Sequence, residues 1–137
     1  MASEPPAARE DGERGSAVVD FVMVSMLIVA LLLAVLQVAV YAHVRNVVTA
    51  SAQEGARFAA NADVDSSLGA ARTVEVVARA TTERTAEGLA CTSAEETDPS
   101  GLTLVVVECS GSVPSLISAL GNLLPLEVTG RAVKEGA

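Results

Sequence analysis

One uncharged apolar segment restricts how this chain can fold more than any other feature. From Phe21 to Ala42 the sequence has 22 residues without Asp, Glu, Lys or Arg. A helix of this length is about 33 Å long, which is enough to cross a hydrocarbon core of about 30 Å. In a chain of 137 residues, the remaining sequence is too short to bury such a helix on every side. We therefore expect a membrane span rather than a buried core helix.

Composition disfavours several classes of function. Aromatic residues make up 2% of the chain, and the formal net charge is −8, from 9 basic and 17 acidic residues. Nucleic-acid binding usually needs a basic surface with stacking side chains, so we expect no nucleic-acid partner. One histidine and two cysteines leave few ligands for a metal. No catalytic triad, carboxylate pair or phosphate-binding loop stands out. We expect no enzyme activity, no cofactor, no metal and no small-molecule substrate.

The rest of the chain divides on either side of the apolar segment. We expect 1–15 to be a polar, disordered leader, 16–43 a transmembrane helix and 44–137 an extracytoplasmic domain. Arginines flank the span almost equally, so charge bias does not set its orientation. The larger part follows the span and holds both cysteines, which favours export. We therefore expect a single-pass plasma-membrane protein with a cytoplasmic N-terminus.

Two helices are expected up to about residue 89. Apolar, mostly small residues recur every fourth position after the span, at Val44, Val48, Ala52, Ala56 and Ala60. This ridge favours one continuous helix to about residue 61, forming a stalk in which Gly55 is the weak point. Together with Ala30 and Ala34 in the span, we expect the ridge to pack against other subunits. A second, amphipathic helix is expected over about 66–89. Its expected charged stripe is Arg72, Glu75, Arg79 and Glu83, and its packing side is Ala71, Val74, Val77 and Ala78.

The C-terminal part predicts a small antiparallel β-hairpin and completes an α+β fold. Residues 91–101 are typical of a loop, while Leu102–Cys109 and Leu126–Val133 have the β-branched or alternating pattern of strands. We expect a break at Ser110–Pro114 and a short apolar helix over 115–124, ended by a proline. A two-stranded sheet is marginal alone, so we expect it to pack on the helices.

The two cysteines, Cys91 and Cys109, are 18 positions apart. In an exported domain they favour a disulfide, which would contribute about 3 kcal/mol in the chain-entropy model. Two buried free thiols are the alternative. The sequence contains no CxxC motif, so redox or metal chemistry is not expected at these cysteines.

The most informative polar residues lie where the apolar segment begins, in the sequence ERGSAVVDF. Gly15 directly precedes the run, and Asp20 lies inside it. An ionised carboxylate costs about 2.5–3.5 kcal/mol at mid-membrane and less near the end of a span. Asp20 is therefore either tolerated at the headgroup level or functional. If the chain is cut between Gly15 and Ser16, Asp20 of one subunit could pair with the new amine at Ser16 of a neighbour.

The pattern RGSAVVDF followed by an apolar run resembles the processing site of type IV prepilin-like proteins, in particular the TadE-like family of tight-adherence (Tad/Flp) pilus assembly proteins. The segments QEGARFAA, LTLVVVEC and LEVTGRAV extend the resemblance. It implies that a prepilin peptidase cuts after Gly15 and that Ser16 becomes the N-terminus, with Asp20 replacing the more usual Glu. The mature chain would be a structural minor pseudopilin that supports assembly of a Tad-type pilus or a related secretion system. The implied partners are the peptidase, other pseudopilins or pilus platform proteins, and the lipid bilayer.

Two alternatives remain open from the sequence. Val40–Tyr41–Ala42 offers small residues for a signal-peptidase cut after Ala42, which would release a secreted, non-enzymatic binding domain. Asp20 would then have no role. The chain could instead stay uncleaved as a single-pass anchored extracytoplasmic protein. A mature N-terminus at Ser16, at His43 or at the original start distinguishes the three.

Overall fold

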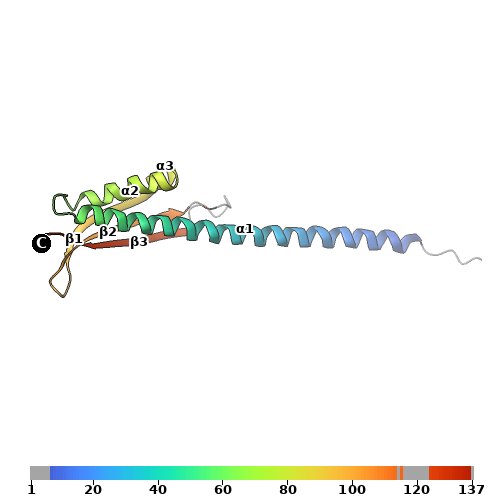
Figure 1. Ribbon diagram of the computed structural model, residues 1–137. Coiled ribbons are helices and arrows are strands. Elements are labelled where there is room, and N and C mark those ends of the chain that lie inside the picture. Colours follow the sequence, from blue (N-terminus) through green and yellow to red (C-terminus); the bar gives the residue numbers. More distant parts are fainter. Residues whose placement is uncertain (1–6, 114, 116–123, 137) are drawn as a thin grey trace, which may run out of the picture. The chain divides into compact units, whose positions relative to one another are not determined.

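A computed structural model of the chain describes residues 7–113, 115 and 124–136 (Figure 1). Its elements are α1 (Ala7–Ala60), α2 (Leu68–Ala80), α3 (Glu83–Glu87), β1 (Leu89–Thr97), β2 (Thr103–Val113) and β3 (Leu124–Val133). The chain divides into two compact units, Met1–Leu36 and Gln37–Ala137, and α1 contributes to both. We call the second unit the head. The long N-terminal helix, the further helices and the antiparallel sheet confirm the expected α+β class.

In the first unit, α1 begins at Ala7, well before the expected start near residue 16. The expectation of disorder was therefore wrong for residues 7–15. Ala, Arg and Glu, which make up most of this segment, are strong helix formers, and Gly12 and Gly15 are the unfavourable residues among them. A polar composition does not by itself exclude a helix.

In the head, three antiparallel strands form one sheet in the order β1-β2-β3. The buried residues of β2 include Val105, Val107 and Val113, and those of β3 include Leu126 and Val128. The ridge predicted on α1, from Val44 to Ala60, is buried. Most of it forms one core with Val77 of α2 and with all of these strand residues except Val105, which packs with Ala60 in a second, smaller cluster. The ridge therefore packs within its own chain. The expectation that it mediates contacts between subunits was wrong.

Two glycines allow the closest approaches to α1. A Cβ atom at Gly130 of β3 would lie 2.3 Å from the carbonyl carbon and oxygen of Ala52. A Cβ atom at Gly55 of α1 would lie 2.0 Å from Thr73 Oγ1 and 2.5 Å from the carbonyl oxygen of Gly69 on α2. The backbone of α1 thus touches β3 on one side and α2 on another. Gly55, expected to be the weak point of the helix, is instead a contact position.

The second helix is shorter than expected, because α2 ends at Ala80 and α3 follows. The Thr81 N–H and hydroxyl both donate to the Val77 carbonyl, at 2.9 and 2.8 Å. The Thr82 hydroxyl then caps α3 by accepting from the Thr85 N–H at 3.2 Å. Threonine hydroxyls compete for backbone groups in this way and favour helix ends. Two successive threonines therefore divide the expected helix into two.

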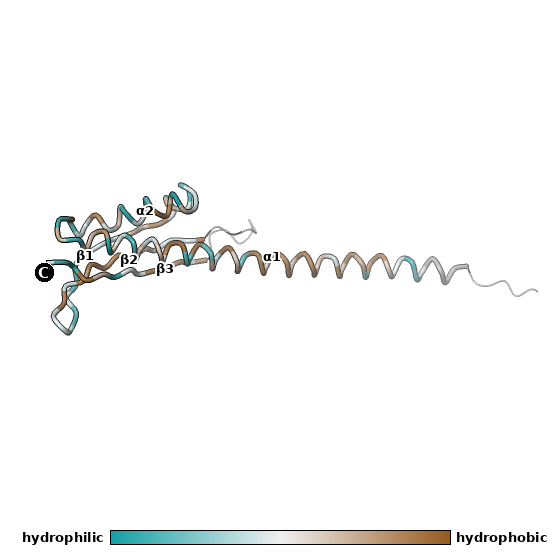
Figure 2. The backbone as a smooth tube through the Cα atoms, viewed as in Figure 1, coloured by the Kyte–Doolittle hydropathy of each residue, from teal (hydrophilic) through white to brown (hydrophobic). Residues whose placement is uncertain are grey.

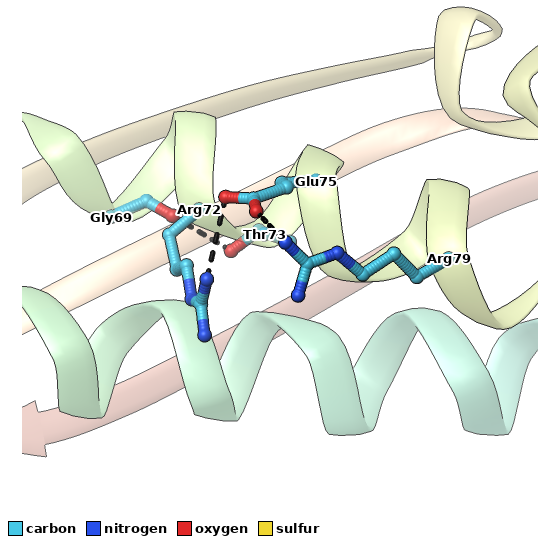
Figure 3. A network of polar contacts seen from close by, with 5 residues as sticks. All are labelled: Gly69, Arg72, Thr73, Glu75 and Arg79. Atoms are coloured by element: carbon cyan, nitrogen blue, oxygen red, sulfur yellow. Dashed lines mark hydrogen bonds and ion pairs between the residues drawn. The ribbon is translucent and has the colours of Figure 1, made fainter.

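The packing side of α2 differs from the expectation at one position. Val77 is buried, and Val74 and Ala78 are partly buried against the core, as expected. Ala71 is exposed, and Gly69 and Thr73 are buried in its place. The Thr73 hydroxyl donates to the Gly69 carbonyl at 2.8 Å, so its burial leaves no polar group unpaired (Figure 3).

The charged side of α2 is confirmed for three of its four members. Arg72 Nη1 lies 3.3 Å from Glu75 Oε2, and Arg79 pairs with the other oxygen of Glu75 (Figure 3). Glu83 belongs to α3 instead. Glu75 and Arg79 are exposed and Arg72 is partly exposed, so each pair contributes only about 0.3–0.5 kcal/mol.

The predicted antiparallel pairing of the last two strands is confirmed, but both strands are longer than expected. Their register runs from Leu104↔Val133 to Val113↔Leu124. β2 continues through the expected break to Val113, and β3 already begins at Leu124. Pro125 therefore lies within β3, where its missing N–H is tolerated because β3 is an edge strand. The helix expected over 115–124 lies almost entirely outside the described residues.

The strand β1 was missed, because residues 91–101 were expected to form a loop. β1 pairs with β2 from Leu89↔Gly111 to Thr97↔Thr103. Only Leu89, Cys91 and Ser93 of β1 are partly buried, and its other residues are exposed. An edge strand of this kind is held by backbone hydrogen bonds to its neighbour. Because most of its side chains are exposed, its sequence has few of the apolar and β-branched residues from which a strand is predicted.

Candidate functional site: the apolar helix and its polar junction

The described part of the first unit is an exposed apolar helix. Fifteen large apolar side chains between Val18 and Leu36 are exposed, and this part of α1 is coloured as hydrophobic in Figure 2. Covering such side chains is worth about 1.5–3 kcal/mol each, so leaving all of them in water would cost on the order of tens of kcal/mol. Within the described residues, α1 is the one helix long and apolar enough to cross a membrane.

Gly15 and Ser16, predicted for processing, and Asp20, predicted for assembly, all lie on α1 and are exposed. Ser16 and Asp20 are four positions apart, so they lie on one face of the helix, one turn from each other. A Cβ atom at Gly15 would meet nothing within 4 Å. The peptide bond between Gly15 and Ser16 is therefore not covered by other parts of the described chain.

The predicted disulfide is confirmed in the head. Cys91 of β1 and Cys109 of β2 are joined with an S–S distance of 2.07 Å, and the two residues are directly opposite in the strand register. Cys109 is buried in the core and Cys91 is partly buried against it. The bond ties the polar edge strand β1 to the central strand.

A lysine clasp at the end of α1 was missed by the sequence analysis. Lys134 Nζ donates to the carbonyls of Ala59, Asn61 and Val64, at 2.9, 3.0 and 2.6 Å. A cation at a helix C-terminus is favourable because the helix dipole and the unpaired carbonyls are negative there. Lys134 is the sole lysine in the sequence, but its partners lie about 70 positions earlier, so no local pattern reveals them.

Two aspartates stabilise turns of the head: Asp65 in the turn between α1 and α2, and Asp98 in the turn between β1 and β2. Hydrogen bonds from the side chain and backbone of Ser67 lower the pKa of Asp65 below its usual value. The Ser100 hydroxyl chiefly lowers the pKa of Asp98, with help from backbone N–H groups that include that of Leu102. Both carboxylates therefore act as turn caps. Among the described residues, no group of three or more His, Cys, Asp or Glu side chains could hold a metal.

Tyr41 connects the start of the head's helix to the sheet, a contact that the sequence did not reveal. Its hydroxyl donates to the Pro125 carbonyl at 3.1 Å. Val40 and Tyr41 are partly buried against the head's core. The last residues of the apolar segment thus belong structurally to the head.

Comparison with known proteins gives one match. The family model described as TadE-like protein matches residues 15–57, which is 43 of the 137 residues. No curated protein and no solved structure matches the chain. The matched segment starts at Gly15 and includes Ser16, Asp20 and the whole apolar segment. Over residues 15–57 this chain is thus similar to the TadE-like family, whose members are associated with the assembly of Tad pili.

Proposed function

We propose that this chain is a structural, non-enzymatic membrane protein, a minor pseudopilin-like subunit that supports assembly of a Tad-type pilus or a related secretion system. The observation that carries the proposal is the exposed apolar part of α1, which begins just after Gly15, where the family similarity also starts. In this proposal residues 16–43 span the plasma membrane once. The N-terminus is cytoplasmic, and the disulfide-bonded head is exported.

We further propose that a prepilin peptidase cuts between Gly15 and Ser16. The exposure of both residues supports this, because no packed side chain has to move for a peptidase to reach the bond. The family match also starts at Gly15. The alternative cut after Ala42 would remove Tyr41 and its hydrogen bond to Pro125, and thereby a contact that the head uses.

Assembly in this proposal depends on the span. The new amine at Ser16 pairs with Asp20 of a neighbouring subunit, which fixes the axial register in a low-dielectric environment. The small residues Ala30 and Ala34, which are exposed, allow close packing of helices in the membrane. The partners are other pseudopilins or pilus platform proteins.

The processing step is tested by the matched substitutions Gly15→Leu and Gly12→Leu. Both glycines lie in α1, and a Cβ at either meets nothing within 4 Å, so neither change disturbs packing. The measurement is the N-terminal residue of protein purified from the native membrane, by intact-mass and terminal-peptide mass spectrometry. We expect the parent chain and Gly12→Leu to start at Ser16, and Gly15→Leu to keep its leader. A parent chain that starts at His43, or that keeps its leader, contradicts the proposal.

The assembly step is tested with Asp20→Ala and the conservative control Asp20→Glu. We expect both variants to insert in the membrane, because Asp20→Ala removes a charge from the span and so lowers the cost of insertion, while Asp20→Glu keeps the same charge as the parent chain. Only Asp20→Ala should lose pilus assembly, counted by electron microscopy of cells. Normal assembly by Asp20→Ala would refute the role given to this carboxylate.

A further inference from the structure

The geometry points to a lipid-contacting surface on the head, at the end of the sheet that lies beside Tyr41. We call this surface the rim and define it by Tyr41 of α1, Leu89 of β1, Ser112 of β2, and Leu124 and Pro125 of β3. The partner we propose is the bilayer surface. This inference rests on the proposed function in one respect, namely that α1 spans a bilayer.

The strand register brings the rim residues together. Leu89 lies opposite Gly111, and Ser112 lies opposite Pro125, so the start of β1, the end of β2 and the start of β3 share one end of the sheet. The hydrogen bond from the Tyr41 hydroxyl to the Pro125 carbonyl fixes that end beside α1. All of these residues belong to the head, so their arrangement is internal to one compact unit.

The rim is uncharged and incompletely covered. Pro125 is exposed, and Tyr41, Leu89, Ser112 and Leu124 are each partly exposed. The sequence carries no charged residue from Cys109 to Leu126. A soluble surface at the end of a sheet normally gathers charged side chains, whereas an uncharged mixture of apolar groups, a proline and a tyrosine suits the membrane interface.

The length of the apolar run places the rim at the depth of the lipid headgroups. Ala17–Leu36 is 20 residues, about 30 Å of helix, which already fills a hydrocarbon core. The uncharged residues from Gln37 to Ala42 add about 9 Å and belong to the head. Core and headgroups together measure about 40–45 Å, so the headgroup layer on each side is about 5–7.5 Å thick. The five residues from Gln37 to Tyr41 add about 7.5 Å, which puts Tyr41 at the outer edge of this layer. If the span is instead Phe21–Ala42, Tyr41 lies at the edge of the core. Both registers bring Tyr41, and with it the rim, into contact with lipid.

The inference is tested with single tryptophans, because the sequence contains none. Three matched Leu→Trp substitutions probe the span, the rim and the opposite end of the sheet: Leu32→Trp, Leu124→Trp and Leu102→Trp. The full chain is placed in vesicles of phosphatidylcholine and phosphatidylglycerol, with and without bromine on the acyl chains. The readout is the loss of tryptophan emission caused by bromine, together with the emission maximum. Disulfide formation and circular dichroism check that each variant is folded.

We expect strong quenching for Leu32→Trp, clear quenching with a blue-shifted maximum for Leu124→Trp, and little of either for Leu102→Trp. Quenching of Leu32→Trp without quenching of Leu124→Trp would overturn the inference and leave the membrane span intact, as expected if the rim binds protein instead. Equal quenching at all three sites would also overturn it, because the contact would not be specific to the rim. An unquenched Leu32→Trp would refute the span itself. If Leu124→Trp does not fold, Pro125→Trp takes its place, because that side chain is exposed.

Discussion

Helix propensity and tertiary packing predict opposite effects of Gly55→Ala on the stability of the head. In an exposed helix interior, replacing glycine with alanine stabilises by about 1 kcal/mol. At Gly55 the added methyl group would lie 2.0 Å from Thr73 Oγ1 and 2.5 Å from the carbonyl oxygen of Gly69. Carbon–oxygen contacts cannot be this short, and the second of them is to backbone. The variant therefore forces α2 away from α1.

The magnitude follows from the two opposing effects. Overpacking of a tight contact costs about 1–3 kcal/mol and occasionally more, and here the backbone of α2 must move rather than a flexible side chain. Because backbone must move, we take the upper part of this range, about 2–3 kcal/mol. Subtracting the gain in helix propensity of about 1 kcal/mol leaves an expected net loss of about 1–2 kcal/mol. For a domain of the head's size this corresponds to a fall in Tm of roughly 4–16 °C.

The assay is thermal unfolding of the full chain in mild detergent, followed by circular dichroism, with hydrogen exchange of the α2 amides as a second readout. Gly88→Ala is the matched control, because its Cβ would have ordinary contacts at 3.5 and 3.6 Å. We expect its Tm to change little and the α2 amides of Gly55→Ala to exchange faster. Adding Thr73→Ala should restore part of the loss by removing the shortest contact. A Tm for Gly55→Ala above that of the parent chain would refute the close helix crossing.

Three further changes test other contacts of the head. Lys134→Met should lower the free energy of unfolding by about 1–2 kcal/mol, because three charge-assisted hydrogen bonds at a partly exposed site are lost, and α1 amides near residue 60 should exchange faster. Replacing both Cys91 and Cys109 by serine should cost about 3 kcal/mol in urea unfolding, with early exchange of the β1 amides. Asp98→Ala should destabilise the head at pH 7. Because the folded pKa of Asp98 lies below its unfolded value of about 4, its contribution is fully present above pH 4 and is lost as the pH falls through the folded pKa. The stabilities of the variant and the parent chain should therefore converge in acid, and equal stabilities at pH 7 would argue against the turn cap.

The sequence alone determined the features that depend on neighbouring residues. The apolar segment and the ridge from Val44 to Ala60 are local patterns, and hydrophobic run length and periodicity report them directly. The last two strands were predicted because Leu102–Cys109 is rich in β-branched residues and Leu126–Val133 alternates apolar with polar residues. The disulfide between Cys91 and Cys109 was predicted because the sequence has two cysteines, in a domain that we expected to be exported, and the structure confirms the bond.

Only the tertiary structure decided the features that depend on distant residues. β1 exists because β2 offers it backbone partners, and its own polar side chains do not predict a strand. Gly55 is a contact position because α2 crosses α1 there, and Lys134 caps a helix whose end lies about 70 positions earlier in the chain. Local propensities amount to about 1 kcal/mol per residue or less, so a steric contact or a set of charged hydrogen bonds between distant segments can override them.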